Sequence, residues 1–219
     1  MLSTFEAKVD AKHTALLLLD LQHDFIASDG WLARSGKDVQ PLQAVIPAIE
    51  HVRQTARDCG VLVAFLARTS TEHTRTDVWV EQQQRAYPSM GDAIAPCVAG
   101  TSGADFHQVL PKANDLVIRR PAYSGFGGME LDMVLRGNGI RTVVIAGVRT
   151  NDSVTATAAD AFAHGYYVAV LSDCTAGTSP AAHTETLVTI DELYGAVVPS
   201  EHFVTTLRRH NSGQAARSR

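Results

Sequence analysis

Residues 142–171 decide the fold, and they read TVVIAGVRTNDSVTATAADAFAHGYYVAVL. The run Thr142–Ala146 is short and continuously apolar, which is typical of a strand buried on both faces of a parallel sheet. Asn151–His164 is rich in alanine and stops at Gly165, as a helix that ends on a glycine does. Tyr167–Leu171 is a second apolar run. A strand, a helix and a strand in this order predict two parallel strands of one sheet.

The same alternation continues through the rest of the chain. Further strands are predicted at Thr14–Asp20, Val61–Leu66, Asp115–Ile118 and Ala196–Val198. Further helices are predicted at Leu42–Cys59, Met129–Arg136, Pro180–Tyr194 and Ser200–Leu207. Repeated strand–helix units predict a three-layer α-β-α sandwich around a doubly wound, mostly parallel, Rossmann-like sheet of about six strands. We expect a single domain over residues 1–207 and a disordered tail over 208–219. Thr69–Gly103 lacks periodicity, and we expect it to cover the functional site or an interface.

Composition narrows the class of protein. Of 219 residues, 45% are hydrophobic and 19% charged, which indicates a globular core rather than disorder. A net charge of -4 with mixed signs gives no basic face for nucleic acid. The longest apolar run, Ala15–Leu19, is far shorter than the roughly 20 residues that span a bilayer. Three cysteines without CxxC spacing fit a reducing compartment: Cys59, Cys97 and Cys174. We therefore expect a cytoplasmic protein that acts on a small molecule, with no nucleic-acid or membrane partner.

Chemistry is expected where the strands end, because ligands of doubly wound sheets bind at the carboxyl ends of the strands. Asp20 ends the first strand, where it can be a general acid or base, or a helix cap. Arg120 follows the third strand and can grip an anion or carbonyl, or lie solvated on the surface. Ser153 lies in the first turn after the fourth strand, where backbone N–H groups favour a developing negative charge. It can be a nucleophile or a capping residue.

Three segments at these strand ends together resemble the isochorismatase-like hydrolase family, also called the cysteine hydrolases. They are Leu17–Phe25 (LLLDLQHDF), Arg120–Phe126 (RPAYSGF) and Val143–Val154 (VVIAGVRTNDSV). The likeness extends from about Thr14 to Leu207, and Tyr123–Phe126 (YSGF) is most similar to the ureide and carbamoyl amidohydrolase branch. The resemblance implies the isochorismatase-like fold and a homodimer or homotetramer.

The resemblance also implies a chemistry. In the amidases of that family an Asp deprotonates a Cys thiol, a Lys orients and stabilises charge, and the thiolate attacks an amide carbon. This chain has Asp20 at the Asp position, Arg120 at the Lys position and Ser153 at the Cys position. The family pattern further implies a cis peptide between Val148 and Arg149, and an oxyanion hole at the N–H groups of Arg149 and Ser153. A hydroxyl is far less acidic than a thiol, whose pKa is about 8.5, so slower acylation is expected.

The serine at the nucleophile position leaves two origins open. Ser153 is either the natural residue or an engineered substitute for the cysteine, and an engineered exchange leaves Arg120 unexplained. The expected function is hydrolysis of a C–N bond in a small amide, ureide or carbamoyl compound. One alternative is isochorismatase-type hydrolysis of an anionic substrate without a thiol, with Asp20 as general acid. The other is a pseudoenzyme that binds a ligand without turnover.

The sequence also predicts which residues line the substrate pocket. Apolar walls are predicted from Phe25, Trp31, Tyr123 and Phe126, with core packing as the alternative for each. Asn151 is predicted to bond the substrate or to cap the helix. The nicotinamidase branch carries a metal-binding Asp-x-His after the second strand, where this chain reads LARTST at 66–71. We therefore expect no metal and no cofactor.

Overall fold

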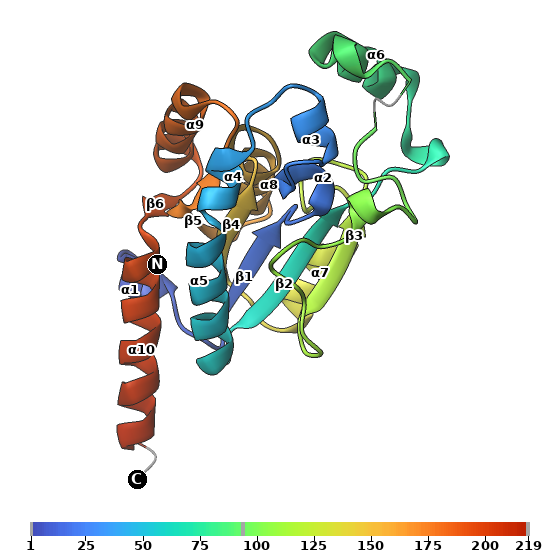
Figure 1. Ribbon diagram of the computed structural model, residues 1–219. Helices are drawn as coiled ribbons and strands as arrows, with labels where there is room; N and C mark the ends of the chain where they lie inside the picture. The colour runs from blue at the N-terminus through green and yellow to red at the C-terminus, as the bar shows by residue number, and fades with distance from the viewer. Residues whose placement is uncertain (1, 93–94, 218–219) are drawn as a thin grey trace.

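A single parallel sheet organises the computed structural model, which describes residues 2–92 and 95–217. Its six strands lie in the order β3-β2-β1-β4-β5-β6 (Figure 1). They are β1 (Thr14–Leu19), β2 (Leu62–Arg68), β3 (Leu116–Arg120), β4 (Thr142–Val148), β5 (Tyr167–Ala176) and β6 (Ala196–Val198). The chain runs outward in one direction from β1 to β3 and in the other from β4 to β6, so the switch point lies between β1 and β4. This confirms the predicted fold class.

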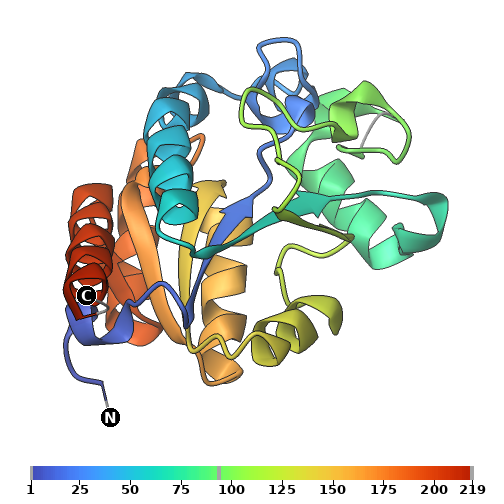
Figure 2. The same ribbon diagram turned by 90° about the horizontal axis from the view of Figure 1, so that it is seen from below.

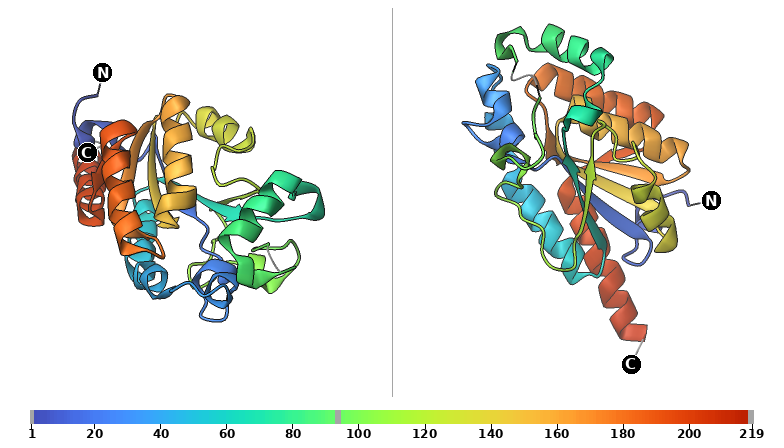
Figure 3. Two further views of the ribbon diagram at one scale, coloured as in Figure 1. Left: turned by 90° about the horizontal axis from the view of Figure 1, so that it is seen from above. Right: turned by 90° about the vertical axis from the view of Figure 1, so that its right-hand side faces the viewer.

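Both faces of the sheet are covered by helices (Figures 2 and 3). Leu16 and Leu18 of β1 face a cluster that includes α5 (Ile46–Asp58) and α10 (Ser200–Arg217). Ala15, Leu17 and Leu19 face the opposite cluster. That second layer consists of α7 (Glu130–Gly137), α8 (Thr155–Ala163) and α9 (Pro180–Leu193). Because β1 is buried on both faces, its sequence is continuously apolar rather than alternating.

Several predicted boundaries differ from the structure. The helix expected over Leu42–Cys59 is two helices, α4 (Gln40–Ala44) and α5, because each has a proline in its first turn. The helix expected from Asn151 begins as a π turn, η4 (Thr150–Val154), which leads into α8. The fifth strand continues to Ala176, so that Cys174 lies within β5 rather than after it.

The segment without periodicity, Thr69–Gly103, contains one regular helix among its described residues, α6 (Asp77–Ala86). Thr76 caps it by accepting a hydrogen bond from the Trp79 amide at 3.2 Å. Figure 1 shows α6 standing off beyond the carboxyl-end side of the sheet. Short helices complete the connections: α1 (Phe5–Lys8), α2 (His23–Ile26), α3 (Trp31–Arg34), η1 (Glu72–Thr74), η2 (Pro88–Met90) and η3 (Ser102–Ala104).

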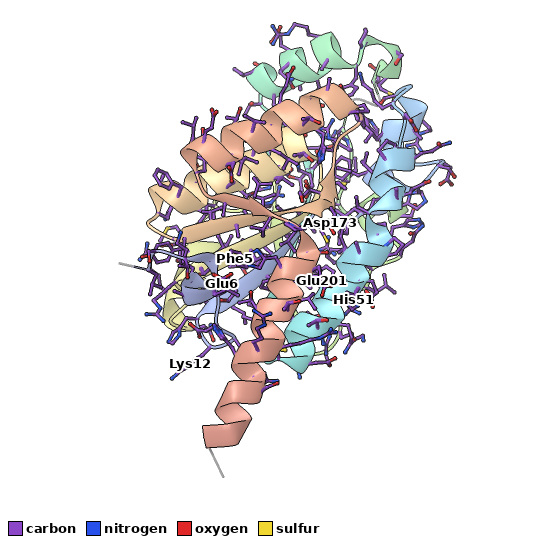
Figure 4. The ribbon with its side chains drawn as sticks, turned by 90° about the vertical axis from the view of Figure 1, so that its left-hand side faces the viewer. Phe5, Glu6, Lys12, His51, Asp173 and Glu201 are labelled. Carbon is purple, nitrogen blue, oxygen red and sulfur yellow. The ribbon has the colours of Figure 1, made fainter. Side chains whose placement is uncertain are left out.

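The last helix, α10, continues to Arg217, ten residues past the Leu207 boundary that the sequence predicts. The stretch 208–217 is therefore helical where a disordered tail is expected, while residues 218–219 lie outside the described residues. Near its start α10 packs beside α1, where Phe5 and Glu6 lie (Figure 4). The His202 ring nitrogen is 2.7 Å from a Glu6 carboxylate oxygen. Among the described residues, no helix has the length and apolar character needed to cross a membrane.

The close pairing of β1 and β4 predicts that alanine substitution lowers stability at Gly147 and leaves it unchanged at Gly128. Gly147 in β4 has φ 121, and a Cβ there would lie 2.3 Å from the Leu19 carbonyl oxygen of β1. Gly147→Ala should lower the free energy of unfolding by roughly 2–5 kcal/mol, from backbone strain and steric overlap together. Gly128→Ala is the matched control, because nothing lies within 4 Å of its added methyl. It should change stability by less than about 0.5 kcal/mol. Urea denaturation of both variants checks this, and equal stabilities would contradict the packing at β1/β4.

Candidate active site

A buried carboxylate brings three strand ends together. Asp20 directly follows β1 with φ 54, and its side chain is 3% exposed. Its Oδ1 accepts a hydrogen bond from Arg120 Nη2 at 3.0 Å. Its Oδ2 accepts one from the Ser153 hydroxyl at 2.5 Å. The three residues that the sequence singles out as candidate catalytic groups are therefore in direct contact.

Arg120 reaches this carboxylate from the last position of β3, across the end of β2, which separates β3 from β1. Its Nη1 donates to the carbonyl of Ala122, which fixes the other end of the guanidinium. Burial lowers the pKa of Arg120 from its ordinary value, the charge of Asp20 opposes that shift, and the charge of Arg68 adds to it. Burying the charge of Arg120 without Asp20, or that of Asp20 without Arg120, would greatly destabilise the fold. Each charge therefore requires the other.

Ser153 lies in the π turn between β4 and α8 and is 1% exposed. The peptide bond that enters this turn, between Val148 and Arg149, is cis. The carbonyl of Arg149 accepts hydrogen bonds from the amides of Asp152 and Val154, at 3.2 Å each. These bonds close the turn tightly. They hold the backbone of Arg149 and Ser153, the two expected oxyanion-hole residues, within one short loop.

A third charged residue, Arg68, lies against Ser153 and was not singled out from the sequence. It is the last residue of β2 and is 4% exposed. Its Nη2 lies 3.4 Å from Ser153 Oγ and 3.4 Å from Asp152 Oδ1. Its guanidinium carbon lies 4.2 Å from the centre of the Tyr123 ring. The sequence feature that singled out Arg120, a cation at the end of a strand, applies to Arg68 as well. It was missed because the second strand was predicted to end at Leu66.

Beside these residues lies a cavity of about 350 Å³. It is lined by Gln82, Ala86, Tyr87, Tyr123, Arg149, Asn151, Asp152 and Ala156. Gln82 and Ala86 come from α6, so the aperiodic segment does cover this site. Arg149 forms an ion pair with Asp152 and donates to the Tyr87 hydroxyl at 2.8 Å. Burial works against the charge of Arg149, yet Asp152 and Tyr87 raise its pKa above the ordinary value.

The predicted pocket residues divide into two groups. Tyr123 and Asn151 line the cavity. Phe25 is buried in the core, with the Arg68 guanidinium 5.8 Å from its ring centre. Trp31 lines a separate cavity of about 330 Å³, and its ring centre lies 4.7 Å from that of Tyr87. Phe126 lies in the core cluster on the α7–α9 side, where its ring stacks on His164 at 4.9 Å, so it is packing rather than pocket wall.

Comparison with known proteins places this geometry in a family. A family profile described as Isochorismatase domain matches residues 14–202. The chain belongs to the isochorismatase family. Ureidoacrylate amidohydrolase RutB of Stutzerimonas stutzeri is 31% identical over 208 residues, which cover 88% of this chain and 82% of that protein.

Solved structures of the family have the same fold. The cysteine hydrolase of Pseudomonas syringae pv. phaseolicola superposes with a TM-score of 0.80 at 22% identity, over 93% of this chain and 96% of that one. The N-carbamoylsarcosine amidase of Thermoplasma acidophilum superposes with a TM-score of 0.66 at 27% identity, over 85% and 96%.

The cysteines of this family member are poor substitutes for a nucleophile at Ser153. Cys97 is fully buried, and burial, Asp20 and Asp24 raise the pKa of its thiol well above the ordinary value. Burial, with a contribution from Asp173, raises the pKa of Cys174 to about 12. Both remain protonated at neutral pH, and a thiol reacts as its thiolate. Among residues 2–92 and 95–217, no group of three or more His, Cys, Asp or Glu side chains is placed to hold a metal ion.

Alkylation should measure the difference in reactivity between these thiols. Native protein treated with iodoacetamide at pH 7.5 should be modified slowly and only at Cys59, the one partly exposed cysteine. Cys97 and Cys174 should react only after unfolding. Ser153→Cys should add a second, faster site, because Arg68 and Arg120 favour its thiolate. Peptide mapping by mass spectrometry measures the sites. Rapid modification of native Cys97 would instead identify that thiol as a candidate nucleophile.

Proposed function

We propose that this protein is an amidohydrolase that cleaves the C–N bond of a small amide, ureide or carbamoyl compound with Ser153 as nucleophile. The observation that carries the proposal is the 2.5 Å hydrogen bond from Ser153 Oγ to Asp20 Oδ2. A nucleophile and base within hydrogen-bonding distance, with the base oriented by a third group, is the arrangement that acyl transfer requires. Arg120 is that third group, bound to the other oxygen of Asp20.

In the proposed acylation step Ser153 Oγ attacks the carbonyl carbon and passes its proton to Asp20. The carbonyl π electrons move to the oxygen, which becomes an oxyanion. The N–H groups of Arg149 and Ser153 are proposed to donate to it. As the intermediate collapses, the C–N bond breaks and the nitrogen leaves with the proton held by Asp20. The products are ammonia or an amine and an acyl ester on Ser153.

Water completes the cycle. It attacks the ester carbon while Asp20 accepts one of its protons, and the same backbone donors hold the second oxyanion. Collapse breaks the bond to Ser153 Oγ, which recovers its proton from Asp20. Arg120 cannot act as the proton carrier, because a guanidinium does not deprotonate in proteins. Its proposed part is to fix Asp20 and keep it charged between the two half-reactions.

The charge around the cavity favours a substrate that carries a negative group. Three guanidinium groups meet two carboxylates here: Arg68, Arg120 and Arg149 against Asp20 and Asp152. The excess positive charge suits a carboxylate, and the Tyr123 ring and the Asn151 amide suit a flat, polar body. The similar proteins named above carry names that refer to a ureide and a carbamoyl compound, which agrees with this choice.

Ammonia release from a panel of ureido and carbamoyl acids tests the proposal. The wild type should turn over at least one compound, and Asp20→Asn and Ser153→Ala should each lower kcat/KM by about 10²–10⁴-fold, the usual loss of a base or nucleophile. Ser153→Cys should retain or exceed the wild-type rate. Ser212→Ala, an exposed serine of α10, is the control and should change nothing.

Two results would contradict the proposal. Full turnover by Ser153→Ala would exclude the serine as nucleophile, and activity on isochorismate that survives this change would favour isochorismatase-type hydrolysis with Asp20 as general acid. No turnover by any variant, with no covalent adduct on Ser153→Cys, would leave a binding protein without amidase activity.

A further inference from the structure

The guanidinium of Arg68 has so far been given only a share in the positive charge that suits a substrate carboxylate, although it lies against the Ser153 oxygen. We propose that Arg68 is a catalytic residue that stabilises the alkoxide of Ser153 and so allows a serine to act where a thiol would ionise by itself. The inference rests on the proposed function only in taking Ser153 as the nucleophile. It concerns the reactivity of that oxygen, whatever the substrate.

The hydrogen bonds around Ser153 have the polarity that such a role requires. The single hydroxyl proton is directed at Asp20 Oδ2, so the Oγ lone pairs remain available as acceptors. Arg68 Nη2, a donor that is always charged, lies 3.4 Å from that oxygen. As the proton moves to Asp20, negative charge develops on Oγ, and the contact between a cation and a neutral hydroxyl becomes one between a cation and an anion, which is stronger.

Arg68 is held in place before any substrate binds. The amide of Arg68 donates to Gln22 Oε1 at 2.7 Å, and Gln22 Nε2 donates to the Arg68 carbonyl at 2.9 Å. The side chain lies over the Tyr123 ring and bonds to Asp152 Oδ1 at 3.4 Å. A cation fixed in a buried site stabilises a developing charge without reorganising when the reaction occurs.

One donor of this guanidinium remains to be satisfied. Arg68 Nε is buried and has no hydrogen-bond partner among the described residues, and Arg120 Nε shares that property. A buried donor without a partner is costly, and native proteins keep few of them. Both Nε groups belong to arginines that contact the Asp20–Ser153 pair. A substrate oxygen held beside Ser153 would have these donors within its surroundings.

The proposed role of Arg68 predicts a different pH dependence for a serine and for a cysteine at position 153. An alkoxide forms only in the transition state, so its stabilisation matters at every pH at which the hydroxyl is protonated. A thiol with a pKa near 8.5 is fully ionised at about pH 9.5–10 and then needs little help from a neighbouring cation. Loss of Arg68 should therefore be costly for Ser153 across this range. For the Ser153→Cys variant it should be costly only at lower pH.

The test measures nucleophilicity directly. Diethyl 4-nitrophenyl phosphate carries no carboxylate. Attack by Ser153 Oγ forms a P–O bond, expels 4-nitrophenolate with its electron pair and passes the hydroxyl proton to Asp20. Release of 4-nitrophenolate and the protein mass gain give the rate. Arg68→Gln should slow this reaction about 10²–10³-fold at both pH 7.5 and pH 9.5. Arg68→Lys, which keeps a charge without the fork, should be intermediate. Arg141→Gln, an exposed arginine, is the control.

The effect of Arg68→Gln is then measured in the Ser153→Cys background and compared with its effect on the serine. Iodoacetamide is the probe, and peptide mapping follows the alkylation of residue 153. Arg68→Gln should slow alkylation at pH 7.5 and change it less than about threefold at pH 9.5. Equal losses in both backgrounds at both pH values would show a merely structural effect and overturn the proposal. So would wild-type phosphorylation rates in Arg68→Gln. Circular dichroism and thermal melting identify any variant that fails to fold, and Arg68→Lys then carries the comparison.

These outcomes are separable from those of the proposed function. Phosphorylation of Ser153 that depends on Arg68, with no ammonia release from any compound, would support the role of Arg68 and reject the amidase. Turnover in which Arg68→Gln raises KM for carboxylate substrates and leaves kcat unchanged would support the amidase. It would make Arg68 a substrate-binding residue and reject its action on the alkoxide.

Discussion

A carboxylate buried at the end of β1 is the constraint on which the site depends. Asp20 has almost no contact with solvent, and an ionised carboxylate is stable there only with a charged, hydrogen-bonded partner. Arg120 is that partner, and it must cross the end of β2 to reach it. The doubly wound order of the strands makes the arrangement possible, because β1 and β4 pair side by side up to Leu19 and Gly147, and Asp20 then bonds to Ser153 in the turn that follows β4.

Around that pair the site is richer in cations than a single ion pair requires. Arg68 and Arg149 both bond to Asp152, so the two carboxylates and three guanidinium groups form one network beside the cavity. The proposed role of Ser153 as nucleophile would make use of such a network. The hydroxyl needs a base on one side and a positive charge on the other, whereas a thiol can dispense with the second. A lysine in place of Arg120 would be a compact charge, whereas an arginine offers a fork that binds two acceptors.

The sequence was sufficient for the sheet and for the residues at its main strand ends. Continuous apolar runs such as Thr142–Ala146 mark buried parallel strands, and helices between them fix the direction. The pattern of apolar residues along the sequence could not show which groups the long side chains contact. Arg68 was missed because β2 extends two residues beyond its apolar run, and Phe126 was expected at the pocket because an aromatic in a core and one in a wall look alike in sequence. The helical residues 208–217 show how weakly polar sequence marks a helix end.

Acylation of Ser153 can be observed directly by rapid quenching. A substrate identified by ammonia release would be mixed with enzyme at equal concentration, quenched in acid within milliseconds to seconds, and digested for mass spectrometry. We predict a transient mass gain, equal to the acyl group, on the peptide that carries Ser153. The gain should be absent from Ser153→Ala and should decay as the acid product appears. An acyl group on Cys97, or turnover without any covalent species at Ser153, would contradict the account.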